Sequence, residues 1–139
     1  MKTALLAGRL LFGAWMLANG LSHFFGPFWP APTGTEPLAA QLMHALADIG
    51  LLDIAMGIQL GAGACLLAGV FVPAALCATM PIAVCAAYWA VILEREPVGA
   101  LLALVAVALN GLLMLAHLEH YRGVLERHAL AIGEAEEAA

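Results

Sequence analysis

The sequence is poor in charge, in basic residues and in cysteine, and each shortage excludes a class of protein. Only 11% of its 139 residues are charged and 64% are hydrophobic, whereas a soluble domain carries about 25% charged residues. Five Lys and Arg against ten Asp and Glu leave no basic surface for nucleic acid. The three cysteines form neither a Cys-x-x-Cys pair nor an iron–sulfur motif, and no nucleotide-binding fingerprint is present. What remains is an integral membrane protein.

Four unbroken apolar runs predict four membrane-spanning helices, at about residues 4–25, 49–72, 74–93 and 98–118. Residues 37–48 predict a short amphipathic helix that continues into the second span. The predicted fold is an all-α, four-helix transmembrane bundle over residues 1–125, followed by an acidic, flexible tail at 126–139. The first run also resembles a cleaved signal peptide, but Arg9 interrupts it and it is long for one.

The few basic residues predict the orientation of the bundle. Lys2 and Arg9 precede or begin the first span, and Arg122 and Arg127 follow the last one. The loop between the first two spans has no Lys or Arg, and the third loop has only Arg95. Because basic loops stay on the cytoplasmic side, both termini are expected to be cytoplasmic.

Polar side chains at the non-cytoplasmic end of several spans form the candidate site. This topology brings together the end of the first span, the start of the second and the end of the third, and ionisable groups at membrane depth are costly. In a continuous helix Asp48 lies nearly in line with Gln59, whereas Asp53 is turned away from Asp48. The candidate ligand-binding residues at this outer mouth are Asn19, His23, His44, Asp48, Asp53, Tyr88 and Trp89.

Several interpretations of this cluster stay open. A carboxylate beside an imidazole can pass protons, and the same groups with aromatic neighbours suit the head group of a quinone or a lipid-like ligand. A set of His23, His44, Asp48 and Asp53 offers nitrogen and oxygen ligands, but no tight metal-binding motif is present, so we predict no metal site. The sequence assigns no residue a catalytic role. In the structural interpretation, Asp48 caps the second helix, Asn19 and Asn110 tie helices together, and His23 lies among lipid head groups.

Residues outside the cluster have structural interpretations. Gln59 and Asn110 are expected to have structural roles inside the bundle. The stripe of Gly8, Gly13 and Gly20 lets another helix approach the first span closely. The cysteines Cys65, Cys77 and Cys85 are expected to be small buried residues.

Short motifs in the sequence resemble those of DoxX-like membrane proteins. They are Gly8-Arg9-Leu10-Leu11-Phe12-Gly13, Asn19-Gly20-Leu21-Ser22-His23-Phe24, Leu67-Ala68-Gly69-Val70-Phe71-Val72-Pro73, Met80-Pro81-Ile82-Ala83-Val84 and Glu119-His120-Tyr121-Arg122. The resemblance covers about residues 9–125. It implies a multi-pass four-helix protein of the bacterial inner membrane, often bound to redox partners such as a thiosulfate:quinone oxidoreductase. The sequence departs from common members at Tyr88 and Trp89, where they have a polar histidine.

These observations predict a membrane subunit of, or a quinone-interacting partner in, an oxidoreductase system. The alternative is a non-enzymatic membrane scaffold or assembly factor that packs partner helices against the Gly8, Gly13 and Gly20 face. A third function is transport of a small solute or a metal. The expected partners are the lipid bilayer, a quinone or lipid-like ligand, a partner membrane or redox protein, and a second copy of the chain.

Overall fold

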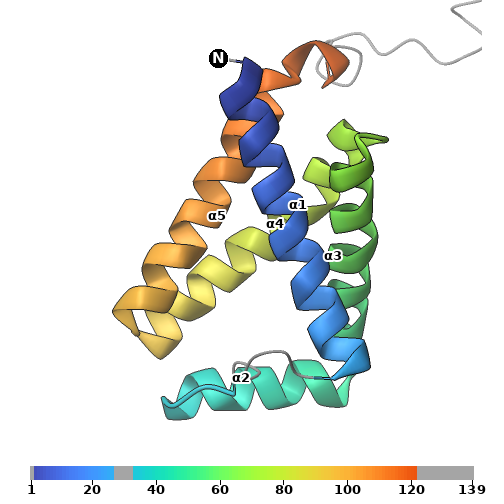
Figure 1. Cartoon of the computed structure of the whole chain (residues 1–139). Coiled ribbons are helices and arrows are strands. Elements are labelled where there is room, and N and C mark those ends of the chain that lie inside the picture. The colour runs from blue at the N-terminus through green and yellow to red at the C-terminus, as the bar shows by residue number, and fades with distance from the viewer. Residues whose placement is uncertain (1, 27–32, 122–139) are drawn as a thin grey trace, which may run out of the picture.

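A computed structural model describes residues 2–26 and 33–121, and every regular element within these ranges is a helix (Figure 1). The predicted tail at 126–139 lies outside the described residues. Four stretches of the described chain are long and apolar enough to cross a membrane. The elements are α1 (Lys2–Phe25), α2 (Pro37–Asp48), α3 (Leu51–Ala68), α4 (Val72–Tyr88), the π-helical η1 (Trp89–Glu94), α5 (Pro97–Ala116) and the 3-10 turn η2 (Leu118–Tyr121).

The helix boundaries follow from local chemistry. Proline at the first turn starts α2 and α5, where its missing N–H costs nothing. The carboxylate of Glu96 caps α5 by accepting hydrogen bonds from the backbone N–H groups of Val98 and Gly99. Gly69, with φ of 74°, ends α3 in the left-handed conformation that glycine adopts most easily.

The structure corrects the prediction that α2 runs continuously into the second span. The α2 helix ends at Asp48, and Gly50 adopts a φ of 74° before α3 begins at Leu51. This left-handed residue turns the chain, because an α-helix has no place for positive φ. Asp48 and Gln59 therefore do not share a helix face, and Asp48 does not cap α3, whose N-cap is Gly50 with no side-chain bond.

The four long helices form two pairs that diverge along their length. The α1 helix packs most extensively on α3, and α4 packs on α5. In Figure 1 the two pairs lie close together at the end that holds the N-terminus and η2, and spread apart at the other end, where α2 lies across the bundle. We call these the termini end and the α2 end. Both ends of the described chain lie at the termini end.

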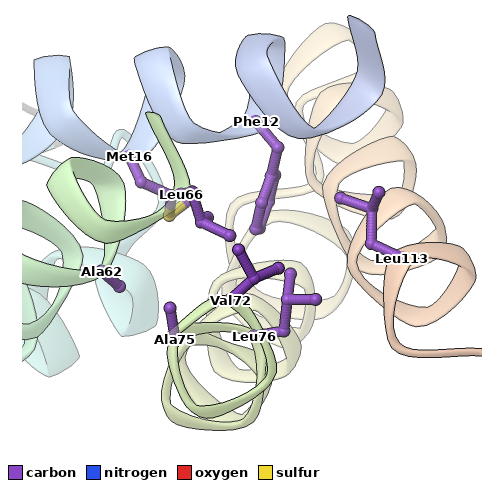
Figure 2. Close-up of a cluster of buried hydrophobic side chains, with 8 residues drawn as sticks. All are labelled: Phe12, Met16, Ala62, Leu66, Val72, Ala75, Leu76 and Leu113. Carbon is purple, nitrogen blue, oxygen red and sulfur yellow. The ribbon is translucent and has the colours of Figure 1, made fainter. Parts of the chain in front are cut away.

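The hydrophobic core fills the termini end. Phe12 from α1, Leu66 from α3, Leu76 from α4 and Leu113 from α5 are at most 2% exposed and point toward one another (Figure 2). Close packing of such side chains excludes both water and lipid from this half of the bundle. The full buried cluster consists of Phe12, Met16, Ala62, Leu66, Val72, Ala75, Leu76 and Leu113.

A buried hydrogen bond joins α4 and α5 beside this core. Asn110 Nδ2 donates to Thr79 Oγ1 at 3.0 Å, and both residues are fully buried. The hydroxyl of Thr79 in turn donates a hydrogen bond to a backbone oxygen of α4, that of Ala75 or Leu76. Asn110 therefore ties two helices together as expected, in the way that polar side chains often do inside membranes.

Glycines bring α1 and α3 into close contact. A Cβ on Gly20 would lie 2.7 Å from Leu60 Cβ, and one on Gly63 would lie 2.8 Å from the oxygen of Gly13. On the other side of α1, a Cβ on Gly8 would meet Leu109 of α5 at 3.1 Å. The predicted glycine face thus serves packing within the chain, so the expectation that it receives partner helices is wrong.

The cysteines differ from the expectation of buried residues. All three are free; Cys65 is half-buried, whereas Cys77 and Cys85 are exposed. Both exposed cysteines belong to α4, and Cys77 lies beside Tyr121 of η2.

Candidate ligand-binding cavity

A cavity of about 390 Å³ lies between the two helix pairs in the half of the bundle near α2. Its α1 wall includes Trp15 and Asn19, its α3 wall consists of Met56 and Gln59, and Trp89 of η1 contributes a second indole ring. The cavity lies toward the end at which the two helix pairs spread apart (Figure 1), and Met16 belongs both to its wall and to the core.

Small side chains form most of the wall opposite α1 and α3. The α4 helix and η1 contribute Ala83, Ala86 and Ala90, which are spaced by three and four residues and so lie on one face. The α5 helix contributes Gly99, Leu102, Ala103 and Ala106 at similar spacing. Because alanine and glycine fill little space beyond the backbone, the diverging helices leave a void between them.

One polar pair lies at the rim of the cavity. His23 Nε2 lies 2.6 Å from Asp53 Oδ1, which joins α1 to α3. The His23 side chain is 26% exposed and the Asp53 side chain 63%, so the pair faces the surroundings as well as the cavity wall. Ion pairs with this much exposure contribute at most about 1 kcal/mol to stability.

A single buried amide lies deeper in the cavity wall. Gln59 is 7% exposed, and its Oε1 has no hydrogen-bond partner among the described residues. A buried polar atom without a partner is costly, typically about 1–3 kcal/mol. Unlike Asn110, whose Nδ2 donates to Thr79, Gln59 accepts no hydrogen bond at its Oε1 from another helix within the described residues.

Two contacts fasten α2 to the end of the third span. Trp89 Nε1 donates a hydrogen bond to the backbone oxygen of Ala39 at 3.1 Å. The carboxylate of Glu94 accepts hydrogen bonds from Thr35, through its backbone N–H at 2.9 Å and its hydroxyl at 2.5 Å. Trp89 and Glu94 are the first and last residues of the π-helical η1. Short π-helical segments recur at functional sites.

The structure brings together only part of the predicted site. Asn19, His23 and Trp89 line the cavity, and Asp53 reaches His23 without lining it. His44 and Asp48 do not line it, because α2 is a separate surface helix and both side chains lie on its exposed side. Tyr88, at the end of α4, is 55% exposed and does not line the cavity.

This arrangement bears on the interpretation of the cluster as a metal site. In the described ranges, no three His, Cys, Asp or Glu side chains are grouped so as to hold a metal ion. The set of His23, His44, Asp48 and Asp53 is not assembled, since only His23 and Asp53 meet.

Sequence reasoning missed the deeper wall of the cavity. Gln59 was visible as a lone amide in an apolar span, which is itself an indication of function in a membrane protein. The small residues at helical spacing in the third and fourth spans were visible too, but small residues ordinarily indicate close helix packing. Those that line the cavity are Ala83, Ala86, Ala90, Gly99, Ala103 and Ala106.

The composition and the four apolar helices define a multi-pass membrane protein. No family model, curated protein or solved structure matches the chain.

Proposed function

We propose that the protein is the membrane subunit of, or a quinone-interacting partner in, an oxidoreductase system, and that its cavity holds a quinone head group. The observation that carries the proposal is the make-up of the cavity: a mostly apolar wall, two indole rings and an unpartnered buried amide at Gln59. Its 390 Å³ falls within the roughly 300–1,000 Å³ typical of small-molecule sites. The resemblance of residues 8–24 to the first span of DoxX-like proteins supports the same assignment.

Each group on the wall has a role toward such a ligand. Trp15 and Trp89 offer flat apolar faces for stacking against a ring. The side-chain N–H groups of Asn19 and Gln59 are donors for ring oxygens. A bound quinone supplies two-electron, two-proton redox chemistry, and because the chain has no nucleotide fingerprint or Cys-x-x-Cys pair, the electrons are exchanged with a partner protein.

The rim of the cavity supports entry of a ligand with an apolar tail. Trp15 of α1 and Leu102 of α5 both line the cavity, and they are 48% and 49% exposed. The cavity therefore reaches the surface between α1 and α5, on flanks that are otherwise apolar and suited to lipid. A tailed ligand can pass sideways from the bilayer without crossing water.

The proposed location is the bacterial inner membrane with both termini cytoplasmic, supported by Lys2 and Arg9 near the termini end. This places Thr35, at the α2 end, outside the cytoplasm. A Thr35→Cys variant with the three native cysteines replaced by serine is expected to react with a membrane-impermeant thiol reagent in intact cells. Labelling only after lysis contradicts this orientation.

A binding experiment tests the proposed ligand. The full chain in lipid nanodiscs is titrated with decylubiquinone in a Trp29→Phe background, so that the two remaining tryptophans, Trp15 and Trp89, both line the cavity. Saturable quenching of their fluorescence is expected. Ala103→Phe fills the cavity and is expected to weaken binding at least tenfold, whereas the matched Ala108→Phe changes an exposed position outside it and leaves binding unchanged.

The matched variants make the outcome decisive. Quenching that rises linearly with the quinone-to-lipid ratio and does not saturate contradicts the proposal, because such quenching reports only partition of the quinone into the bilayer. Equal affinities for Ala103→Phe and Ala108→Phe contradict it as well, since a ligand in the cavity must collide with a phenylalanine ring at residue 103.

A membrane scaffold is the second candidate, favoured by the surface of α5. This helix is the most apolar of the four, yet only 11% of its 18-residue window is buried inside the chain. Such a face suits packing against a partner helix in the membrane. A scaffold is expected to co-purify in fixed stoichiometry with another membrane protein, and the Ala103→Phe variant is expected to keep that partner.

A further inference from the structure

Gln59 is the least satisfied polar group on the wall of the cavity. Gln59 is 7% exposed, and its Oε1 is buried with no hydrogen-bond partner among the described residues. A membrane interior offers little water that could donate a hydrogen bond to this oxygen, so a ligand is the best available partner for the amide.

Two other polar groups of the wall already have partners. The indole N–H of Trp89 is donated to the oxygen of Ala39, and His23 Nε2 is held by Asp53. Asn19 is more exposed than Gln59. Gln59 is therefore the group whose hydrogen bonding changes most when a ligand enters.

The chemistry of an amide distinguishes the two redox forms of a quinone. The carbonyl oxygen of a quinone only accepts, so it satisfies the amide N–H and leaves Oε1 unpaired. The hydroxyl of a hydroquinone donates to Oε1 and accepts from Nε2, so both halves of the amide are satisfied. We infer that the cavity binds the reduced, hydroxyl-bearing form of its ligand, a hydroquinone, in preference to the quinone.

This inference rests on the proposed function, because it needs a quinone-class ligand in the cavity. One additional satisfied hydrogen bond at a buried site corresponds to a preference of about tenfold. The Gln59→Leu variant replaces the amide with an apolar group of similar size, and its preference for the reduced form is expected to disappear.

The experiment compares the two forms on the full chain in nanodiscs. Decylubiquinol, kept reduced under anaerobic conditions, and decylubiquinone are each titrated by calorimetry into wild type, Gln59→Leu and Gln41→Leu. Gln41 is an exposed glutamine on α2 that does not line the cavity, so its variant controls for the chemistry of the substitution. Wild type and Gln41→Leu are expected to bind the quinol about tenfold more tightly, and Gln59→Leu to bind both forms about equally.

The outcomes separate this inference from the proposed function. If neither form binds to wild type, the proposed function fails and the inference fails with it. If the quinone binds as tightly as the quinol, or if the preference survives in Gln59→Leu, the inference is overturned while the binding itself upholds the proposed function. Gln59→Met, a second apolar substitution, replaces Gln59→Leu if circular dichroism shows that the leucine variant does not fold.

Discussion

The contact between α1 and α3 can be tested with two glycines of one helix. Gly63 and Gly61 lie two residues apart on α3, but their surroundings differ. A Cβ on Gly63 would lie 2.8 Å from both the oxygen of Gly13 and the Cα of Leu17, and closer still to the backbone nitrogen of Leu17. A Cβ on Gly61 would meet nothing within 4 Å. The Gly63→Ala and Gly61→Ala variants therefore introduce the same methyl group into a closed and an open site.

The size of the expected difference follows from two opposing effects. Replacing glycine by alanine inside a helix favours folding by about 0.5–1 kcal/mol, and both variants gain this amount. Only Gly63→Ala must also force the two helix backbones apart, and overpacking of this kind costs about 1–3 kcal/mol. Because the gain is common to both, the difference between the variants isolates the cost of the contact. We expect Gly61→Ala to be more stable than Gly63→Ala by about 1–3 kcal/mol.

Reversible unfolding in mixed micelles measures this difference. The variants are titrated with sodium dodecyl sulfate, and helix content is followed by circular dichroism. Gly13→Ala provides a milder change if Gly63→Ala does not fold, since its Cβ would meet mainly the side chain of Leu66, at 2.9 Å. Equal stabilities of Gly63→Ala and Gly61→Ala would refute the close approach of α1 and α3.

Three further contacts make predictions. Thr79→Val is expected to lower the free energy of unfolding by about 0.6–2 kcal/mol, because the buried Nδ2 of Asn110 loses its acceptor, and the same micelle titration measures the loss. Trp89→Phe removes the indole N–H that binds α2, so hydrogen exchange measured by mass spectrometry is expected to accelerate in α2 and to stay unchanged in α3. Burial, followed by proximity to a thiol, raises the pKa of Tyr121 to about 12, so its neutral form is favoured by folding. This contribution to stability is complete below pH 10 and is lost as the pH rises through 12; in a Tyr88→Phe background, absorbance at 295 nm is expected to report ionisation of Tyr121 near pH 12 rather than near 10.

The spans were predictable because a membrane demands long apolar runs, and hydropathy reads such runs directly. The break between α2 and α3 was not predictable in the same way. Ile49 and Gly50 stand within an apolar stretch, and an isolated glycine is tolerated inside a helix as well as at its end. Only the positive φ of Gly50, imposed where α2 turns across the bundle, distinguishes the two cases.

Sequence reasoning could group the helix ends that form the candidate site, but not the rotation of each helix about its axis. Topology alone places the residues of the first span near the start of the second, and His23 does meet Asp53. Which side chains face inward depends on how each helix is turned about its axis, and two adjacent residues show the consequence. Trp89 lines the cavity while Tyr88 is 55% exposed, although the two are consecutive residues.

The cavity depends on α2 as much as on the small residues of its wall. Small residues at helical spacing allow close contact at Gly13 and Gly63, yet the alanines of α4 and α5 border a void. The difference is the spacing between the helix pairs at the α2 end. The α2 helix, about 18 Å long at 1.5 Å per residue, is joined to α3 by two residues. Trp89 of η1 binds Ala39 of α2, and Glu94 of η1 binds Thr35, which lies two residues before α2. The α2 helix therefore bridges the two helix pairs, since it contacts both α3 and η1. Loosening the contacts with η1 is expected to change the width of the cavity while the core around Phe12 stays intact.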